Sequence, residues 1–219
     1  MQLKSSRGLT LVELLVGLAI TAILLTLAVP NFSLWIRNIG IRNATSSILS
    51  GLQLARAEAL KRNTQMRFQL TDSLDAGCSL DATGPFWVVS RDNVAGACDG
   101  TVHGPQMKTE DAAPRIVQVY EGSAMGKGSE CESDRKSCER ARIDADSSLF
   151  AFNGLGRLIA VDGGVPAGDA VINVYGADGE SDCASGGGKA RCLRIVVSPG
   201  GGTRMCDPAL PTTDTQACL

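Results

Sequence analysis

The chain has 219 residues, of which 44% are hydrophobic, 20% are charged and only 4% are aromatic. Its formal net charge is −2 at pH 7, so bulk electrostatic attraction does not favour nucleic acid as a partner. Because aromatic residues are few and glycines number 25, we expect an aliphatic core and many loops, within one modest globular domain.

The first 30 residues contain an apolar run from Leu9 to Val29, which follows a short basic segment and ends before Pro30. A helix rises about 1.5 Å per residue, so a run of this length matches the ~30 Å hydrocarbon core of a bilayer. Glu13 lies inside the run, where an ionised carboxylate without a partner costs roughly 2.5–3.5 kcal/mol or more. The run predicts a membrane-spanning helix whose carboxylate needs a partner.

A secretory signal carries its small-residue cleavage site after the apolar region and is lost with it. Here the small residue, Gly8, precedes the apolar region, so cleavage after Gly8 would leave the helix on the mature protein. The segment Gly8–Glu13 reads G-L-T-L-V-E and resembles the G-F-T-L-[IV]-E leader of type IV pilins and type II secretion pseudopilins. Leu9 stands where that family usually has Phe. The alternative is a plain membrane anchor in which Glu13 is incidental.

The resemblance implies a prepilin leader over residues 1–8 and cleavage between Gly8 and Leu9 by a membrane prepilin peptidase. It also implies N-methylation of the new amine on Leu9. In a helical filament, Glu13 of one subunit would pair with this amine on a neighbouring subunit and so set the register of assembly. Pro30 falls where such proteins commonly break the helix. Residues 9–29 would form the transmembrane and filament-core helix, and residues 30–63 its amphipathic half.

The second half of this helix has an apolar stripe with helical spacing, while most charged residues fall off the stripe. The stripe consists of Ile41, Ala44, Ile48, Leu52, Ala55 and Ala59. This pattern predicts a helix that packs one face on a sheet. Its end, Leu52–Asn63, resembles the L-x-x-A-R-x-E-A-x-x-R-N segment of the GspH/FimT minor pilins. A generic Ala-rich helix is the alternative.

Beyond residue 63, short apolar runs and period-two patterns predict β-strands. The expected strands are Gln65–Leu70, Phe86–Ser90, Arg115–Tyr120, Ser148–Phe152, Arg157–Val161, Ala170–Tyr175, Cys192–Ser198 and Thr203–Cys206. Two segments among them, Phe152–Arg157 and Val197–Pro208, resemble the F-x-x-x-G-R turn and the S-P-x-G-R-x-R-x-C ending of the GspH/FimT domain. We therefore expect an α+β, pilin-like fold, in which the long helix packs on an antiparallel sheet formed by residues 64–219.

All eight cysteines lie beyond residue 77, and an even number confined to the globular part predicts disulfides in an oxidising compartment. Lys4 and Arg7 favour a cytoplasmic leader by the positive-inside rule, but Arg37 and Arg42 just past the helix weaken this asymmetry. The cysteines decide the orientation, and they place the C-terminal domain in the periplasm of a single-pass inner-membrane protein. Sequential pairing would tie four polar insertions, Thr71–Pro85, Arg91–Ala113, Glu121–Asp146 and Ala177–Ala190. The pairs would be Cys78–Cys98, Cys131–Cys138, Cys183–Cys192 and Cys206–Cys218.

Eight cysteines allow 105 connectivities, so this pairing is one among many. Cys206–Cys218 is favoured, because it would hold the C-terminal tail as in pilins. A single histidine and no C-x-x-C pair argue against zinc, and no hydrolase or metalloprotease motif is present, so we expect neither an enzyme nor a cofactor. A calcium site is a weaker alternative in one Gly-rich loop, where the oxygen ligands would come from Asp178, Glu180 and Asp182.

Within the same group, FimT-type minor pilins of competent bacteria bind DNA through a C-terminal G-R-x-R loop. Alignment on Ser198 and Cys206 leaves only Arg204 of the two arginines, with Arg191 and Arg194 nearby. DNA uptake is therefore the alternative to the main prediction. That prediction is a minor pilin or pseudopilin, a structural and assembly-priming subunit whose partners are other pilins, the prepilin peptidase and the inner membrane. The sequence leaves open a type IV pilus or a type II secretion system.

Overall fold

The computed structural model describes residues 10–121, 141–160, 168–176 and 178–218, without the side chains of residues 25–31. The chain divides into two compact units, Met1–Ile36 and Arg37–Leu219, each of which is described by itself. One helix, α1 (Leu11–Arg62), contributes to both units.

Helix α1 is 52 residues long and continues through Pro30, so the helix break expected at this proline is not observed. Proline removes one backbone hydrogen bond from a helix interior, but such a residue can be accommodated without ending the helix. The helix ends where Asn63 adopts a left-handed conformation, with φ of 48°. The amides of Asn63 and Thr64 then donate to the carbonyls of Leu60 and Ala59 at 3.3 and 3.2 Å, the pattern of a Schellman cap.

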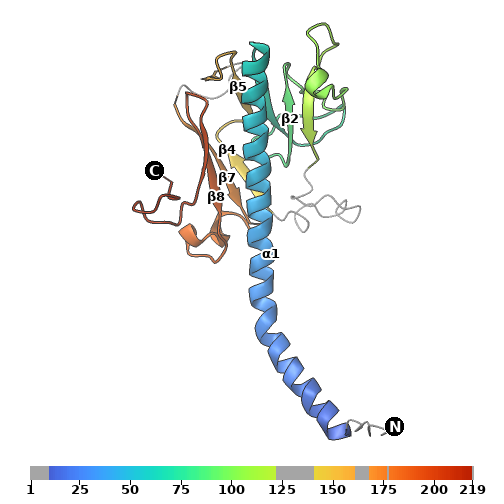
Figure 1. Ribbon diagram of the computed structural model, residues 1–219, viewed down its shortest axis with the longest axis vertical. Helices are drawn as coiled ribbons and strands as arrows, with labels where there is room; N and C mark the ends of the chain where they lie inside the picture. The colour runs from blue at the N-terminus through green and yellow to red at the C-terminus, as the bar shows by residue number, and fades with distance from the viewer. Residues whose placement is uncertain (1–9, 122–140, 161–167, 177, 219) are drawn as a thin grey trace, which may run out of the picture. The chain divides into compact units, whose positions relative to one another are not determined.

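The second unit contains two antiparallel sheets beside the C-terminal half of α1 (Figure 1). Among the described residues, one sheet has the strand order β3-β2-β1-β5-β6 and the other has the order β4-β7-β8-β9. The bounds are β1 Met66–Thr71, β2 Phe86–Ser90, β3 Ile116–Tyr120, β4 Arg142–Ala145, β5 Leu149–Phe152, β6 Leu158–Ile159, β7 Ala170–Tyr175, β8 Leu193–Val197 and β9 Thr203–Cys206. Short 3-10 turns are η1 (Gly104–Gln106), η2 (Glu180–Asp182) and η3 (Ala184–Gly186).

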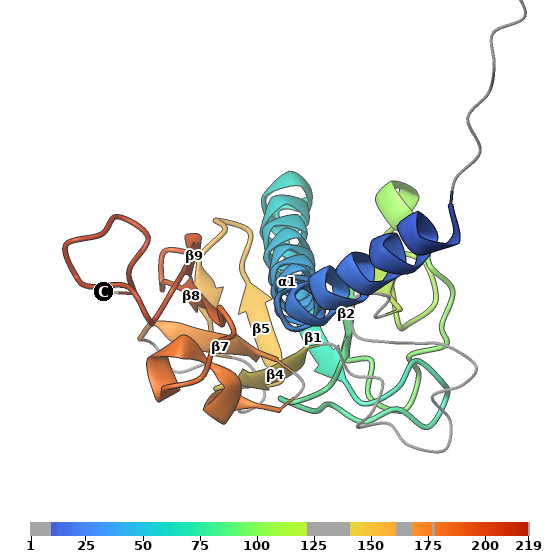
Figure 2. The same ribbon diagram turned by 90° about the horizontal axis from the view of Figure 1, so that it is seen from below.

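The core lies between the sheets and the inner face of α1, and Figure 2 shows labelled strands of both sheets on one side of this part of the helix. Every residue of the apolar stripe expected from the sequence is fully buried, namely Ile41, Ala44, Ile48, Leu52, Ala55 and Ala59. The sheet contributes large side chains, among them Phe68, Phe150 and Trp87. The expected α+β, pilin-like fold with a helix on antiparallel strands is confirmed.

Gly51 is a point of close approach between α1 and the first sheet. A Cβ atom built on Gly51 would lie 2.6 Å from Cε2 of Phe68 and 3.1 Å from Trp87. These rings cannot easily retreat, since Phe68 packs against both Trp87 and Phe150 at centroid distances of 5.5 and 6.1 Å. Trp87 in turn stacks on Tyr120 at 5.3 Å and donates its indole N–H to the Ser47 hydroxyl at 3.1 Å.

A second apolar cluster lies on the opposite face of the first sheet, because Val88 points away from the helix that Trp87 contacts. Its buried members are Cys78, Val88, Val94, Cys98 and Ile116. The Cys78–Cys98 disulfide is thus part of a small core that fixes two of the polar insertions to the sheet.

Two further disulfides, Cys183–Cys192 and Cys206–Cys218, are also sequential pairs. The expected pair Cys131–Cys138 lies outside the described residues. The prediction of a structureless insertion over Glu121–Asp146 was wrong at its end, because Arg142–Ala145 forms β4 and pairs with β7. Polar and apolar residues alternate in this strand, but it is only four residues long and only Ile143 is buried, so it does not stand out from the polar insertion around it.

We expect Gly51→Ala to destabilise the second unit by about 1–3 kcal/mol, because the added methyl group overpacks a rigid aromatic cluster by more than the ~1 kcal/mol that alanine gains in helix propensity. Urea unfolding of the full chain in detergent, followed by near-UV circular dichroism, measures this change. Gln53→Ala, at an exposed position two residues away, is the control and should change stability by less than about 0.5 kcal/mol. Equal stability of the two variants would contradict the packing argument.

Candidate functional site

The N-terminal end of α1 is organised by Thr10 and Glu13. The Glu13 carboxylate accepts hydrogen bonds from the amide and the hydroxyl of Thr10, both at 2.9 Å, and the Thr10 hydroxyl accepts from the Glu13 amide at 3.2 Å. This reciprocal arrangement is a capping box, which satisfies amides that the first turn of a helix leaves unpaired. Glu13 is therefore hydrogen-bonded within one chain, whereas the sequence argument expected no partner before assembly. The T-x-x-E spacing was a signal that this argument missed.

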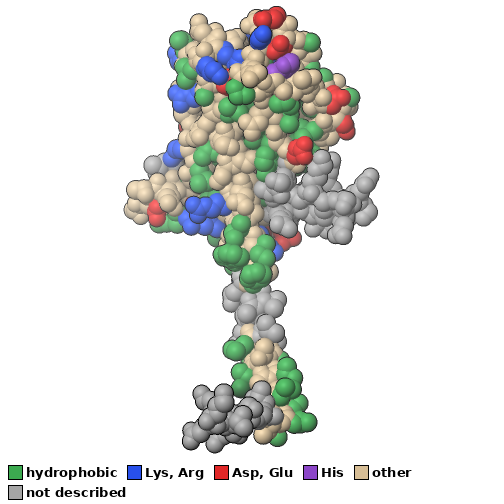
Figure 3. All heavy atoms as spheres, turned by 45° about the vertical axis from the view of Figure 1, so that its right-hand side comes forward, with side chains coloured by type: hydrophobic (Ala, Val, Ile, Leu, Met, Phe, Trp, Pro, Cys, Tyr) green, Lys and Arg blue, Asp and Glu red, His purple; other side chains and the backbone are tan. Residues whose placement is uncertain are grey.

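The helix that follows is apolar on all sides, and its described side chains are exposed. Exposed fractions are 76% for Leu11, 60% for Leu18 and 62% for Ile23. Figure 3 shows the apolar side chains gathered on this segment. Phe32 and Trp35 stack on one another further along and are 59% and 57% exposed. A helix of this composition requires a covering partner, either lipid or other apolar helices.

Within the described residues, the structure contains no helix that is both long enough and apolar enough to cross a membrane. The cleavage-site residues Gly8 and Leu9 lie outside the described residues.

The side chain of Arg56 brings together the three segments that resemble the GspH/FimT pattern. Arg56 belongs to the helix segment, and its Nε donates to the carbonyl of Gly156 in the β5–β6 turn at 3.1 Å. Its terminal nitrogen is 3.4 Å from the carbonyl of Gly200 in the β8–β9 turn. The Leu158 amide also donates to the Pro199 carbonyl at 3.1 Å, which joins the two turns directly. The guanidinium thus links the helix to both sheets.

Gly201 makes this junction sterically possible. A Cβ atom on Gly201 would lie only 1.8 Å from the Gly156 carbonyl oxygen, and its φ of +78° is one that side chains disfavour. The GspH/FimT pattern has glycine at position 201 and arginine at position 56. The structure gives the reason, because the two turns and the Arg56 guanidinium meet in a space without room for a methyl group.

The final turn of α1 contains a second charged group. Glu58 is only 7% exposed and accepts from Arg62 Nε at 2.5 Å and Lys61 at 3.3 Å. Arg62 also donates to the carbonyls of Met107 and Pro105, so it fixes the loop around η1 to the helix. The E-A-x-x-R-N part of the helix segment is therefore an ion pair followed by a helix cap.

Two of the three arginines considered as DNA contacts, Arg191 and Arg194, are bound within the fold. Arg191 donates to the buried carboxylate of Asp207 at 2.6 Å and to Gln216 at 3.2 Å. Arg194 donates to Asn173 at 2.7 Å across neighbouring strands. Arg204 lies exposed on β9. Because Arg191 and Arg194 already have acceptors, the structure does not favour the DNA-binding alternative.

The acidic loop considered for calcium already holds a cation. Arg37 of α1 approaches Asp182 at 2.5 Å and Asp178 at 3.4 Å, where a calcium ion would have to coordinate. No group of three or more metal-ligating side chains occurs in the described part of the chain, and Glu180 stays exposed. The contact fixes the loop that contains the Cys183–Cys192 disulfide to the helix.

Comparison with known protein families gives two matches. Residues 3–29 match the prokaryotic N-terminal methylation motif. Residues 44–201, well over half of the chain, match the model of the type II transport protein GspH. No curated protein matches the chain.

Among solved structures, the chain is similar to the type IV minor pilin FimU of Pseudomonas aeruginosa in two crystal forms. The first has a TM-score of 0.44 at 14% identity and covers 82% of this chain and 95% of FimU. The second has a TM-score of 0.43 at 14% identity, with coverage of 81% and 99%.

A long N-terminal helix, exposed and apolar in its first half and packed on antiparallel sheets in its second, defines a pilin-like subunit. The methylation motif over residues 3–29 belongs to the same class of protein. The chain belongs to the GspH family, and it is a minor pilin or pseudopilin.

We expect Gly201→Ala to destabilise the second unit by about 3 kcal/mol or more, because the methyl group meets a backbone carbonyl and the residue must keep a positive φ. Gly200→Ala is a matched control one residue away, since a Cβ atom there meets nothing within 4 Å. It should change stability by less than about 0.5 kcal/mol. Thermal unfolding of both variants in detergent checks this, and a Gly201→Ala protein as stable as the control would contradict the proposed junction.

Proposed function

We propose that the chain is an inner-membrane subunit that becomes part of a type IV pilus or a type II secretion pseudopilus after its leader is removed between Gly8 and Leu9. The observation that carries this proposal is the combination of an all-apolar exposed helix with a single carboxylate, Glu13, at its N-terminal end. In this proposal the subunit primes assembly and does not itself catalyse a reaction.

The exposed apolar surface is suited to two environments in succession, first the membrane and then the filament. Before assembly, lipid would cover the segment Leu11–Leu24, and after assembly the same segment of neighbouring subunits would replace the lipid. The free energy of moving the subunit from membrane to filament is then small, because apolar surface is covered in both states. Polar interactions must decide the register.

Glu13 is suited to that task because of its place in the helix. Cleavage would create a positively charged amine on Leu9, two residues before α1 begins at Leu11. The N-terminal end of a helix carries about half a positive charge, so a second positive charge there is unfavourable unless a carboxylate offsets it. In the filament, Glu13 of one subunit would supply this carboxylate to the amine of its neighbour, and the capping box would hold its side chain in place.

The disulfides support a periplasmic position for the second unit. Three pairs are formed within the described part of this unit, and such bonds persist in oxidising compartments. A leader with Lys4 and Arg7 on the cytoplasmic side is consistent with this orientation. The proposed partners are therefore the prepilin peptidase on the leader and other pilins along α1.

We expect Glu13→Gln to insert into the membrane normally but to enter filaments at least about tenfold less, because the charge that offsets the Leu9 amine is lost while glutamine still completes the capping box. Immunoblots of membrane and sheared-filament fractions measure the ratio. Glu13→Ala, which loses both the charge and the cap, should be at least as defective. If Glu13→Gln assembles like the unaltered protein and only Glu13→Ala fails, Glu13 acts as a helix cap and the pairing proposal is wrong.

We also expect mass spectrometry of the membrane-extracted protein to show Leu9 as its first residue, with one added methyl group. Gly8→Ala is expected to retain residues 1–8 to a much larger extent, because a side chain at the cleavage position obstructs a peptidase that accepts glycine. Finding the leader on the mature protein would contradict processing at this bond.

A further inference from the structure

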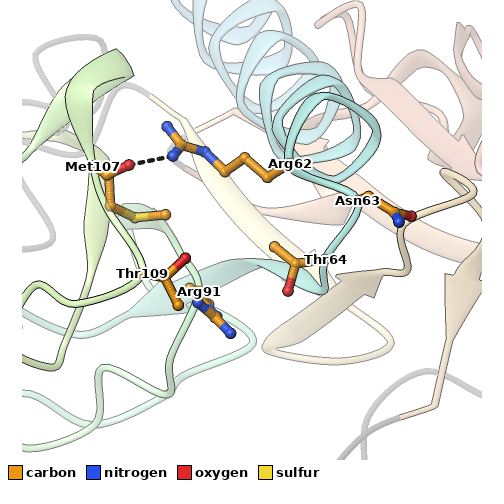
Figure 4. A pocket seen from close by; sticks show the side chains of 6 residues that line it. All are labelled: Arg62, Asn63, Thr64, Arg91, Met107 and Thr109. Atoms are coloured by element: carbon orange, nitrogen blue, oxygen red, sulfur yellow. Dashed lines mark hydrogen bonds between the residues drawn. The ribbon is translucent and has the colours of Figure 1, made fainter.

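A polar pocket of about 270 Å³ lies at the C-terminal end of α1, near the start of β1, the end of β2 and the loop that follows η1 (Figure 4). It is lined by Arg62, Asn63, Thr64, Arg91, Met107 and Thr109. Among these lining residues none is acidic, and all except Met107 carry a side-chain hydrogen-bond donor. The lining therefore suits a ligand that accepts hydrogen bonds.

The helix side of the pocket carries one surplus positive charge. Glu58 is the carboxylate there, and it is shared by two cations, Lys61 and Arg62. Arg62 is held in position by Glu58 and by the Met107 carbonyl (Figure 4). Its guanidinium therefore faces the pocket in a fixed orientation, which lowers the entropy lost when an anion binds.

The sheet side repeats this arrangement. Asp92 accepts from the Arg115 side chain at 2.8 and 2.5 Å, and these hydrogen bonds hold the pKa of Asp92 below its usual value. The charge of Arg91 acts in the same direction. In the described part of the chain, however, the Arg91 guanidinium forms no hydrogen bond or ion pair, since Arg115 occupies the carboxylate. Arg91 is therefore a second cation that no carboxylate binds.

Two effects oppose an anion at this place. The C-terminal end of a helix carries about half a negative charge. Asp111 adds a negative charge near Arg115, but its carboxylate already accepts from the Lys108 amide at 2.6 Å and lies 3.3 Å from His103. The carbonyls of Ala59 and Leu60 at the helix end are occupied by the amides of Thr64 and Asn63. With Asp111 counted, one whole positive charge is left over, and it exceeds the half charge of the helix end. The balance favours a bound anion.

We propose that this pocket binds a carboxylate presented by an acidic segment of a partner protein. A guanidinium matches a carboxylate with two parallel hydrogen bonds, and the threonine hydroxyls can complete the set. The pocket is smaller and more polar than the roughly 300–1,000 Å³ apolar sites that hold small molecules. It is also a single hollow, whereas binding of nucleic acid uses many phosphate contacts along a groove.

We take this partner to be another filament subunit, and that part of the inference rests on the proposed function. Binding of the carboxylate does not, and it can be measured on the isolated full chain. A variant such as Glu13→Gln should bind an acidic peptide as the unaltered protein does, even where it fails to enter filaments. Failure of the two proposals is therefore distinguishable.

The test uses the full chain in neutral detergent at low salt and a fluorescein-labelled, end-blocked peptide with four consecutive glutamates. The same peptide with four glutamines is the reference, and anisotropy gives Kd. We expect the glutamate peptide to bind at least about tenfold more tightly than the glutamine peptide. Arg91→Gln should weaken its binding about tenfold, and Arg91→Lys should weaken it less, because lysine keeps the charge but not the planar fork.

Arg157→Gln is the matched control, because it removes the same charge at an exposed position outside the pocket. It should change Kd less than about twofold, and unfolding temperatures of all variants are compared to show that each is folded. Equal binding of the two peptides, or equal weakening by Arg91→Gln and Arg157→Gln, overturns the proposal. A single-stranded oligonucleotide is the third arm. Binding of the oligonucleotide through Arg91 without binding of the peptide would assign the pocket to phosphate and also overturn it.

Discussion

A helix can bury only the apolar surface that its own chain or a partner covers, and α1 meets this constraint in two different ways. Between Ile41 and Ala59 the sheets of the same chain cover one face of the helix completely. Between Leu11 and Leu24 the described residues leave all of the helix exposed. One continuous element therefore joins a folded domain to a surface that is stable only in a bilayer or among other helices, and this division makes the protein a subunit.

The packing of the sheets on the C-terminal half of α1 depends on close contacts at two glycines. Gly51 lets the aromatic rings of the first sheet approach the helix axis, and Gly201 lets the two turns meet beside Arg56. The guanidinium of Arg56 then joins the helix to both sheets through backbone carbonyls. Sequence segments that are about 100 and 144 residues from Arg56 are in this way parts of one contact. Disulfides outside this junction fix the polar insertions, whose own packing surface is small.

Much of this fold was predictable because its signals are local. The apolar stripe of the helix, the strand patterns of β2 and β7 and the sequential cysteine pairs each depend on residues close in the chain. The strand β4 was missed, since its alternation covers only four residues inside a polar insertion and its pairing with β7 is a tertiary contact. The capping box of Thr10 and Glu13 was predictable from its T-x-x-E spacing. The resemblance to pilins, however, assigns Glu13 a partner in another subunit and does not point to Thr10. The pocket of Arg62 and Arg91 could not be predicted, because its charge surplus depends on which carboxylate each distant arginine contacts.

The distribution of tryptophan gives the molecule two built-in optical reporters. Trp87 is 2% exposed between Phe68 and Tyr120, so its emission should be blue-shifted and should follow the integrity of the globular core. Trp35 is 57% exposed beside Phe32 in the other unit, so its emission should respond to the surrounding medium, whether water, detergent or lipid. Replacing either tryptophan with phenylalanine would leave a single indole fluorophore. The folding of the second unit and the environment of the N-terminal half of α1 could then be followed separately, without any attached dye.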